Sequence, residues 1–262
     1  MTERNLIECK NVELSFTKGK KGVYKALDRI NFTLKQGEIV AIVGKSGAGK
    51  SSFLRVISGL IQPDYGQVLY KDKPVTSVIE DMAMVFQSFA LLPWLSVLEN
   101  VLFGIDAMGV SRKQSEKSAL NMIEVIGLKG FEKHRVSELS GGMKQRVGFA
   151  RALMVSPEIL LLDEPFSSLD IATAKKLRED ILSLWVNKKI ATQSIVMVTH
   201  NIEEAVLMAD RVIVFDAHPG RVAYEHTIDA PRPRVLEADQ VQLAIKTITH
   251  MLYQLDEASL LS

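Results

Sequence analysis

The fold of this chain follows from one stretch, Glu38-Ile-Val-Ala-Ile-Val-Gly-Lys-Ser-Gly-Ala-Gly-Lys-Ser51. Its first half is a continuous apolar run, which predicts a strand buried on both faces. Its second half, Gly44–Ser51, fits the pattern G-x-x-x-x-G-K-[ST] of a glycine-rich loop that opens a helix. Helical spacing of the apolar residues over 53–57, closed by Gly59, predicts that helix.

This glycine-rich loop predicts binding of a nucleoside triphosphate. Its glycines let backbone N–H groups curl around phosphate oxygens, and the helix N-terminus adds partial positive charge. Lys50 is predicted to reach the β- and γ-phosphates, and the Ser51 hydroxyl to ligate Mg²⁺. The predicted nucleotide contacts are Gly44, Ser46, Gly47, Ala48, Gly49, Lys50, Ser51 and Ser52. The alternative is a glycine-rich turn that only joins a strand to a helix.

Strand and helix patterns alternate along the rest of the chain. The N-terminal part is predicted to form strands over Ile7–Phe16 and Ala26–Leu34, with a turn at Lys18–Gly22 between them. Further strands are expected at 68–75, 82–86, 159–162, 194–198 and 212–215. Helices are expected at 141–155, 173–186, 202–208 and about 237–255. This alternation predicts an α/β fold whose main sheet is mostly parallel.

The middle of the chain predicts a helical insertion. Residues 97–137 have helical spacing in two pieces, split by Gly109. We therefore expect one domain over 1–262 that carries an inserted helical subdomain at about 88–157. A C-terminal extension is expected over about 231–262, and its first residues, 230–234, must be extended or turned because they contain two prolines.

Composition excludes several classes of protein. The chain has 47% apolar and 24% charged residues, as globular proteins do. Its 32 Lys and Arg balance 31 Asp and Glu, which does not favour a nucleic-acid partner. The single cysteine, Cys9, excludes a disulfide framework and favours a reducing compartment. Mean hydropathy is +0.11, yet the longest uncharged stretch, Met82–Leu98, is shorter than the roughly 20 apolar residues of a membrane-spanning helix.

A second chemical signal lies at the end of the strand expected at 159–162, which runs into Asp163 and Glu164. Side chains alternate along a strand, so the two carboxylates are expected to point in different directions. Asp163 is predicted to hold Mg²⁺, and Glu164 to polarise the water that attacks the γ-phosphate. We expect this strand to lie beside the phosphate-loop strand. The alternative is a strand end with two solvated acids.

A third signal is the octet Leu-Ser-Gly-Gly-Met-Lys-Gln-Arg at 139–146, which reads as a second phosphate-binding helix start. Ser140 is its cap, and Gly141 and Gly142 expose backbone donors. Together with the loop and the carboxylate pair, this octet resembles the ATP-binding-cassette (ABC) ATPase family over nearly the whole chain. The resemblance implies a P-loop NTPase core with an N-terminal antiparallel β subdomain and the inserted helical subdomain.

The resemblance also implies roles for single residues. Gly44–Ser51 resembles the Walker A motif, Ser140–Gln145 resembles the signature motif that binds ATP, and Asp163 with Glu164 resembles Walker B and its general base. Gln87 resembles the Q-loop glutamine, which senses Mg²⁺ and the γ-phosphate and joins Ser51 and Asp163 as a metal ligand.

Three other positions gain a role in the same way. His200 resembles the switch histidine, a second catalytic residue, and Ser168–Asp170 resembles the D-loop. Phe16 is expected to stack on adenine, with Tyr24 as a competing aromatic. Met143 departs from the family, which often has Gln or Glu there.

The resemblance to the ABC ATPase family also implies binding partners. In the family two ATP molecules lie between two head-to-tail subunits, which implies a homodimer with an isologous interface. The permease is expected to be a separate chain that docks near Phe86–Trp94, with Phe89 and Trp94 as anchors. The alternative is that both aromatic side chains fill the local core. A permease partner implies a place on the cytoplasmic face of the plasma membrane.

Several strings resemble the nitrate/sulfonate/taurine group of importer ATPases. They lie at 91–94, 99–104, 163–166, 200–205, 218–222 and 231–234. They imply a bacterial importer of small anions or organic sulfonates, fed by a periplasmic binding protein. Two alternatives stay open: the ATPase of an exporter or lipid-trafficking complex, and a soluble ABC ATPase that does not act in transport.

Overall fold

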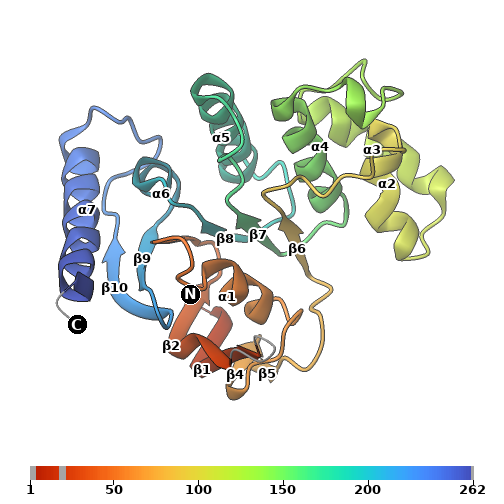
Figure 1. The fold of residues 1–262 in the computed structure, drawn as a ribbon. Helices are drawn as coiled ribbons and strands as arrows, with labels where there is room; N and C mark the ends of the chain where they lie inside the picture. Colours follow the sequence, from red (N-terminus) through yellow and green to blue (C-terminus); the bar gives the residue numbers. More distant parts are fainter. Residues whose placement is uncertain (1–3, 18–21, 261–262) are drawn as a thin grey trace. The chain divides into compact units, whose positions relative to one another are not determined.

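The computed structural model describes residues 4–17 and 22–260, and it divides the chain into two compact units (Figure 1). The first unit holds the residues up to Ile79 and those from Ser194 onward, and the second unit holds Glu80–Gln193. Most of the turn predicted at Lys18–Gly22 lies outside the described residues. The helical insertion predicted at 88–157 falls within the second unit.

The first unit begins with an antiparallel sheet. Its order is β2 (Val23–Lys35), β1 (Asn5–Thr17), β4 (Tyr65–Tyr70) and β5 (Lys73–Pro74). The single strand expected at 68–75 is wrong, because the chain folds back there and Tyr70 pairs with Lys73. Lys71 and Asp72 make this turn with left-handed φ values of 49° and 66°. Asp72 is of a residue type that tolerates a left-handed φ, whereas Lys71 is not, so the turn had only a weak sign in the sequence.

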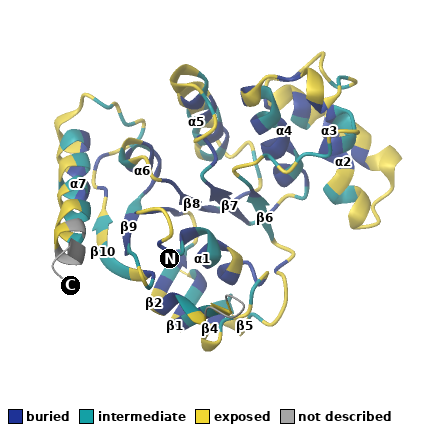
Figure 2. Cartoon of the chain, viewed as in Figure 1, coloured by how far each residue is buried: buried dark blue, intermediate teal, exposed yellow. Residues whose placement is uncertain are grey.

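A second sheet of the first unit carries the phosphate loop. Its order is β10 (Arg221–Thr227), β9 (Arg211–Asp216), β3 (Ile39–Gly44) and β8 (Ser194–Val198). Strand β3 runs parallel to β8 and to β9, while β10 is antiparallel to β9. The expectation that strand 159–162 lies beside β3 is wrong, because β8 and β9 occupy its two edges. The apolar runs of β3 and β8 are buried throughout, as Figure 2 shows for β8.

Helices of the first unit pack on these sheets. They are α1 (Lys50–Ile57), α6 (Ile202–Met208) and α7 (Asp239–Leu260). The apolar face of α1 places Phe53 edge-on to Phe32 of β2, with ring centroids 5.2 Å apart, and 5.6 Å from the ring of Phe215 in β9. This aromatic cluster fixes α1, and with it the end of the phosphate loop.

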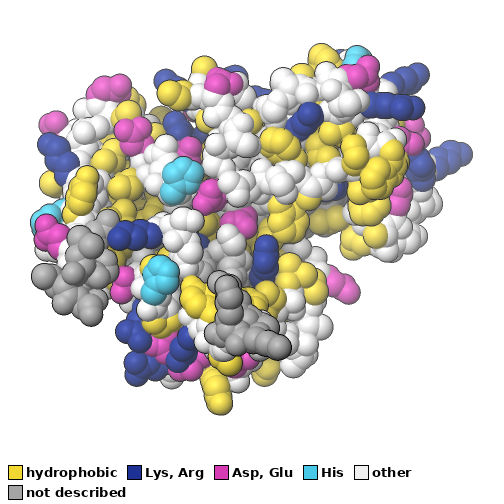
Figure 3. All heavy atoms as spheres, in the orientation of Figure 1, with side chains coloured by type: hydrophobic (Ala, Val, Ile, Leu, Met, Phe, Trp, Pro, Cys, Tyr) yellow, Lys and Arg dark blue, Asp and Glu magenta, His cyan; other side chains and the backbone are white. Residues whose placement is uncertain are grey.

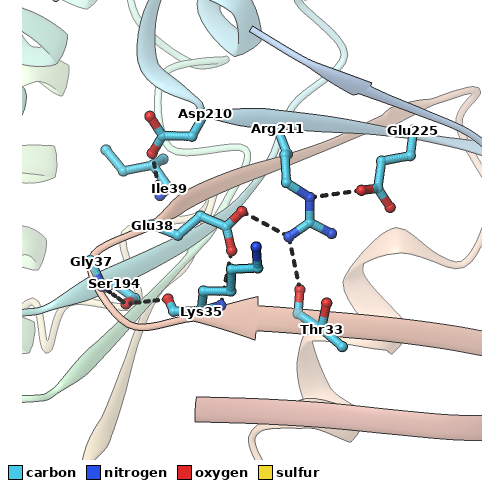
Figure 4. A network of polar contacts seen from close by, with 9 residues as sticks. All are labelled: Thr33, Lys35, Gly37, Glu38, Ile39, Ser194, Asp210, Arg211 and Glu225. Carbon is cyan, nitrogen blue, oxygen red and sulfur yellow. Dashed lines mark hydrogen bonds and ion pairs between the residues drawn. The ribbon is translucent and has the colours of Figure 1, made fainter. Parts of the chain in front are cut away.

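A polar network fastens the start of β3 (Figure 4). Arg211 donates to Glu38 at 2.7 Å and to Glu225 at 2.8 Å, so it joins the start of β3 to β9 and β10. The backbone N–H of Ile39 donates to Asp210 at 2.9 Å. The Ser194 hydroxyl accepts from the Gly37 N–H and donates to the Lys35 carbonyl. Each of these contacts sets where β3 begins, and therefore where its loop emerges.

The second unit pairs two parallel strands, β6 (Met82–Val85) and β7 (Ile159–Asp163). Its helices are α2 (Val97–Ala107), α3 (Arg112–Val125), α4 (Gly141–Met154) and α5 (Ile171–Val186), with a 3₁₀ turn at Val136–Glu138. Apolar side chains of α2, α3 and α4 form one buried cluster. The two helices expected on either side of Gly109 are confirmed.

The α/β fold class is confirmed, with parallel pairing at β3, β8 and β9 in one unit and at β6 and β7 in the other. In the described part of the chain, no helix has the length and apolar character needed to cross a membrane.

Candidate functional site

The phosphate loop is set tightly against its surroundings at both ends. Gly44 has φ +153°, and a Cβ placed on it would lie 2.5 Å from the carbonyl oxygen of Phe215. Gly49 has φ +79°, and a Cβ there would lie 2.7 Å from the Ala26 carbonyl oxygen. A side chain at either position would collide with backbone, so glycine is required by space as well as by conformation.

Lys50 turns back over the loop that it follows. Its buried Nζ donates to the carbonyl oxygens of Gly44 at 2.7 Å and Lys45 at 2.8 Å. Helix α1 begins directly after Gly49, which has no side chain to cap the helix, so the N-terminal N–H groups are oriented toward the loop. An ammonium group and a helix N-terminus at one loop form a cradle for phosphate oxygens.

The two aromatic candidates for adenine lie opposite each other on β1 and β2, where Phe16 pairs with Tyr24. The Tyr24 hydroxyl donates to the Gly47 carbonyl oxygen at 3.3 Å, a contact that the sequence did not reveal. Phe16 is 39% exposed. Tyr24 therefore contacts the phosphate loop directly, whereas the ring of Phe16 is exposed.

His200 follows β8 and is exposed, between two residues with fixed positions. The Thr199 hydroxyl donates to Glu204 at 2.8 Å, and its backbone N–H donates to the Ile42 carbonyl of β3 at 3.2 Å. Asn201 caps α6 by accepting from the Glu204 N–H at 3.2 Å. These contacts hold the backbone on both sides of His200, and the spacing of Asn201 and Glu204 is typical of a helix N-terminus.

In the second unit, the carboxylate pair lies where β7 ends. Asp163 is the last residue of the strand and is 9% exposed. Glu164 leaves the strand with a left-handed φ of 46°, so a turn, rather than strand alternation, separates the two carboxylates. The Ser167 hydroxyl donates to the Glu164 carbonyl oxygen at 3.0 Å and supports this turn.

The structure brings Gln87 to this carboxylate pair. Gln87 Nε2 donates to Glu164 Oε2 at 3.3 Å and to Ser167 Oγ at 3.2 Å. Gln87 and Glu164 are 77 residues apart in sequence, so the prediction that both serve one reaction gains a geometric basis. Ser167 was not among the predicted site residues. Its one sign in the sequence is its position, a hydroxyl three residues after the turn residue Glu164.

The glycine pair at the start of α4 is confirmed as a helix start. The Ser140 hydroxyl accepts from the Met143 N–H at 3.3 Å, and because this donor is backbone, the Met143 side chain does not affect the cap. A Cβ on Gly142 would lie 2.3 Å from Thr173 Cγ2, so α4 and α5 begin in close contact. Hydrogen bonds from Thr173 lower the pKa of Asp170, which caps α5.

The expected docking segment presents one clear surface residue. Trp94 is 69% exposed, so the alternative that it fills the core is wrong, whereas Phe89 is half-buried. Asn100 is fully buried and shapes the backbone beneath Trp94. Its side chain accepts from the Leu92 N–H at 2.9 Å and donates to the carbonyls of Leu92 and Ser96 at 3.1 and 3.0 Å.

Exposed apolar side chains continue from Trp94 onto helix α2. Phe103 of α2 is 48% exposed, and Met108 directly after the helix is 57% exposed. Figure 3 shows hydrophobic side chains gathered over this helix. A surface of this kind, on a helix whose other face is packed in the core, is typical of a protein contact.

Comparisons with known proteins identify the family of the chain. The family model described as ABC transporter matches residues 27–167. The nitrate import ATP-binding protein NrtD of Synechocystis sp. is 43% identical over 213 residues, which are 81% of this chain and 79% of that protein. The taurine import ATP-binding protein TauB of Burkholderia pseudomallei is 39% identical over 213 residues, 81% of each chain.

Among solved structures, the dimeric post-hydrolysis state of the ATP-binding cassette MJ0796 bound to ADP and Pi has a TM-score of 0.73 and 31% identity. The match covers 86% of this chain and 100% of the MJ0796 chain. Likeness of this extent, in sequence and in fold, means that the chain belongs to the ABC transporter family as a subunit that binds and hydrolyses ATP.

Proposed function

We propose that this chain is the ATPase subunit of a bacterial importer of small anions or organic sulfonates, such as nitrate or taurine. The observation that carries this proposal is the likeness to NrtD and TauB over about four fifths of the chain. The names of those two proteins give different cargoes, nitrate and taurine, at nearly equal identity to this chain. The likeness therefore supports the class of cargo and does not single out one compound.

ATP binds through the first unit in this proposal. Lys50 and the backbone of the phosphate loop hold the phosphates, with Ser46, Ala48 and Ser52 among the contacts. The close packing of Gly44 and Gly49 and the ammonium group of Lys50 support this role, because they give the loop a fixed cradle for anionic oxygens. Phe16 stacks on adenine, which its exposed ring supports.

Hydrolysis uses Glu164 as general base, with Gln87 and His200 near the γ-phosphate. A carboxylate activates water by accepting its proton, and the 3.3 Å contact from Gln87 keeps Glu164 oriented. Mg²⁺, when bound, supplies positive charge to the phosphates. Ser51, Asp163 and Gln87 offer the oxygen donors that Mg²⁺ prefers. Gln87 Nε2 donates to Glu164 and Ser167, so its Oε1 is the atom suited to a cation.

A second copy of the chain completes the ATP site in this proposal. Ser140, Gly141 and Gly142 of one copy contact the γ-phosphate bound by the other copy. Two observations support this arrangement: the start of α4 is exposed at Ser140, and the similar MJ0796 cassette forms a dimer bound to ADP and Pi. The interface is isologous, so each copy contributes one phosphate loop and one glycine pair.

The permease docks on the segment Phe86–Trp94 and on the exposed face of α2. Trp94 is the anchor that its exposure supports, since large aromatic residues dominate protein contacts. The chain then works on the cytoplasmic face of the plasma membrane, and a periplasmic binding protein delivers cargo to the permease from the other side.

Reconstitution in vesicles tests this proposal. A permease that co-purifies with this chain is placed in the membrane, with the chain and ATP inside and a periplasmic binding protein with labelled nitrate or taurine outside. We expect uptake with the wild type and none with Glu164→Gln. Release of preloaded cargo, or ATPase stimulation by DNA in place of the permease, would contradict import.

A further inference from the structure

One arginine of helix α4 holds the segment that follows Gln87. Arg151 Nη1 donates to the Ala90 carbonyl oxygen at 2.7 Å, and Nη2 donates to the Phe89 carbonyl oxygen at 3.1 Å. Among the described residues no carboxylate pairs with Arg151, so these two carbonyl oxygens are the acceptors that stabilise its positive charge. Partial burial of the guanidinium lowers the pKa of Arg151.

The two carbonyls belong to a strained turn. Phe89 and Ala90 both have left-handed φ values, 61° and 47°, which cost free energy in residues that carry a Cβ. Within the turn, the Phe89 N–H donates to the Phe86 carbonyl and the Ala90 N–H donates to the Ser88 carbonyl. Such a turn persists when its surroundings fix it, and the Arg151 fork is the charged contact that does so.

Gln87 lies inside this turn, and its own contacts are long. Its two hydrogen bonds, at 3.3 Å to Glu164 and 3.2 Å to Ser167, lie at or beyond the upper end of the usual range. Hydrogen bonds from a charged donor are stronger than neutral ones. The position of Gln87 therefore depends more on the Arg151 contacts than on its own.

We propose that Arg151 is a positioning residue for ATP hydrolysis: by fixing the left-handed turn at Phe89 and Ala90, it holds Gln87 against Glu164. The inference rests on the proposed roles of Gln87 and Glu164. It adds a residue that touches neither nucleotide nor Glu164 and acts through the backbone. Because Arg151 acts on turnover geometry and not on the phosphate loop, its loss lowers kcat and leaves the KM for ATP nearly unchanged.

The first experiment compares Arg151→Met, Arg151→Lys and a control, Lys117→Met, on the exposed surface of α3 in the same unit. We expect Arg151→Met to lower kcat about tenfold, with KM for ATP changed less than about threefold. Arg151→Lys keeps one charged donor, so its kcat is expected to lie between those of the wild type and of Arg151→Met. A normal kcat in folded Arg151→Met, checked by thermal unfolding, would overturn the proposal.

The second experiment separates positioning from simple stability. Glycine adopts left-handed φ values without strain, so Ala90→Gly in the Arg151→Met background lets the turn form without its clamp. We expect this double variant to regain several-fold in kcat over Arg151→Met. Equal kcat in the two variants would overturn the proposal, because a purely structural loss on α4 is not repaired by a glycine in the turn.

A spectroscopic readout and a reference variant complete the test. The chain has two tryptophans, so Trp185→Phe leaves Trp94, four residues after Ala90, as the sole reporter. Arg151→Met is expected to change quenching of Trp94 by acrylamide, and Ala90→Gly to reverse that change. Glu164→Gln is assayed in parallel. If it turns over normally, the proposed function fails; if it is inactive while Arg151→Met is normal, the positioning inference alone fails.

Discussion

The phosphate loop and the region around Gln87 and Glu164 are proposed to serve the same reaction, but they are built differently. The loop emerges from a wholly buried strand, its glycines lie against backbone carbonyls, and Lys50 makes hydrogen bonds of 2.7 and 2.8 Å. Around Gln87, by contrast, the side chain is exposed, its hydrogen bonds are 3.2 and 3.3 Å, and Glu164 itself has a left-handed φ.

The difference teaches which step each region prepares. A loop fixed by packing presents its phosphate cradle before ATP arrives, which favours binding. A segment held by polar contacts and strained turns has a lower barrier to rearrangement, which suits groups that must change position between hydrolysis and release. Substitutions in the loop should therefore act on ATP affinity and folding, and those around Gln87 on turnover.

The largest expected effect is on turnover. Glu164→Gln removes the proton acceptor but keeps the size of the side chain, so kcat should fall about 100-fold or more while ATP still binds. The measurements are phosphate release and nucleotide affinity, together with size-exclusion chromatography with ATP and Mg²⁺. An ATP-bound dimer is expected to accumulate. Near-normal phosphate release would remove Glu164 from the role of base.

The next effect tests the tightness of the loop. Gly49→Ala places a Cβ against the Ala26 carbonyl oxygen and forces a left-handed alanine, so unfolding free energy should fall by about 2 kcal/mol and ATP affinity with it. Gly47 is the matched control: it has φ +82° but open space around its Cβ position. Gly47→Ala should lose about 1 kcal/mol, from backbone strain alone. Equal losses at both positions would mean that packing does not fix the loop.

A smaller effect should follow acidification, through Asp28 in the first unit. Lys25 and Arg221 both donate to Asp28, Arg221 Nε at 2.7 Å, and these bonds lower the pKa of its carboxyl although burial opposes them. The unfolded chain then binds more protons than the folded one below the ordinary aspartate pKa of about 3.9. This stabilisation is present above that pH and is lost as pH falls through the lowered pKa.

Urea unfolding of the wild type and Asp28→Asn between pH 6 and pH 2.5 measures this contribution. The wild type should lose more stability than the variant over the acid range. Parallel curves for the two proteins would show that Asp28 contributes no pH dependence, and the first unit would then depend on packing alone.

The smallest effect on stability is expected at Trp94. Because this side chain is largely exposed, Trp94→Ala should change the unfolding free energy by less than about 0.5 kcal/mol. Stimulation of ATPase activity by the permease should nevertheless fall sharply, and the added substitution Phe89→Ala should lower it further. Buried Phe149 of the same unit is the contrast, since Phe149→Ala should cost about 3–5 kcal/mol. Full permease stimulation in Trp94→Ala would contradict the docking surface.

Sequence patterns predicted elements where apolar residues run unbroken or recur with a helical period. The apolar runs of β3 and β8, and the helices on either side of Gly109, stand where the patterns placed them. Strand β10 was missed because its residues are only partly buried and form no clear alternation. The neighbour of β3 was predicted wrongly, since sheet order depends on long-range packing that no local pattern records.

The residues of the candidate site also fall into two groups, those that the sequence predicts and those that it does not. Residues that belong to motifs, such as Lys50 and Glu164, could be predicted because their chemistry requires a residue type at a fixed spacing. The roles of Asn100 and Arg151 could not, because their side chains bind backbone carbonyls, and those that Arg151 binds lie 61 and 62 residues away in sequence. Ser167 left one sign, a hydroxyl three residues after the turn at Glu164. Backbone acceptors leave no mark in the sequence, so such contacts become visible only in the folded chain.

The hydrogen bonds of Asn100 have a consequence for how this protein can evolve. Its buried amide sets the backbone path over 92–96 from inside the unit, without help from the side chains that face outward. Trp94 and its exposed neighbours can therefore be replaced without altering the path that displays them. A cassette built this way can adapt to a new permease by substitutions at its surface, while the machinery that consumes ATP is inherited unchanged.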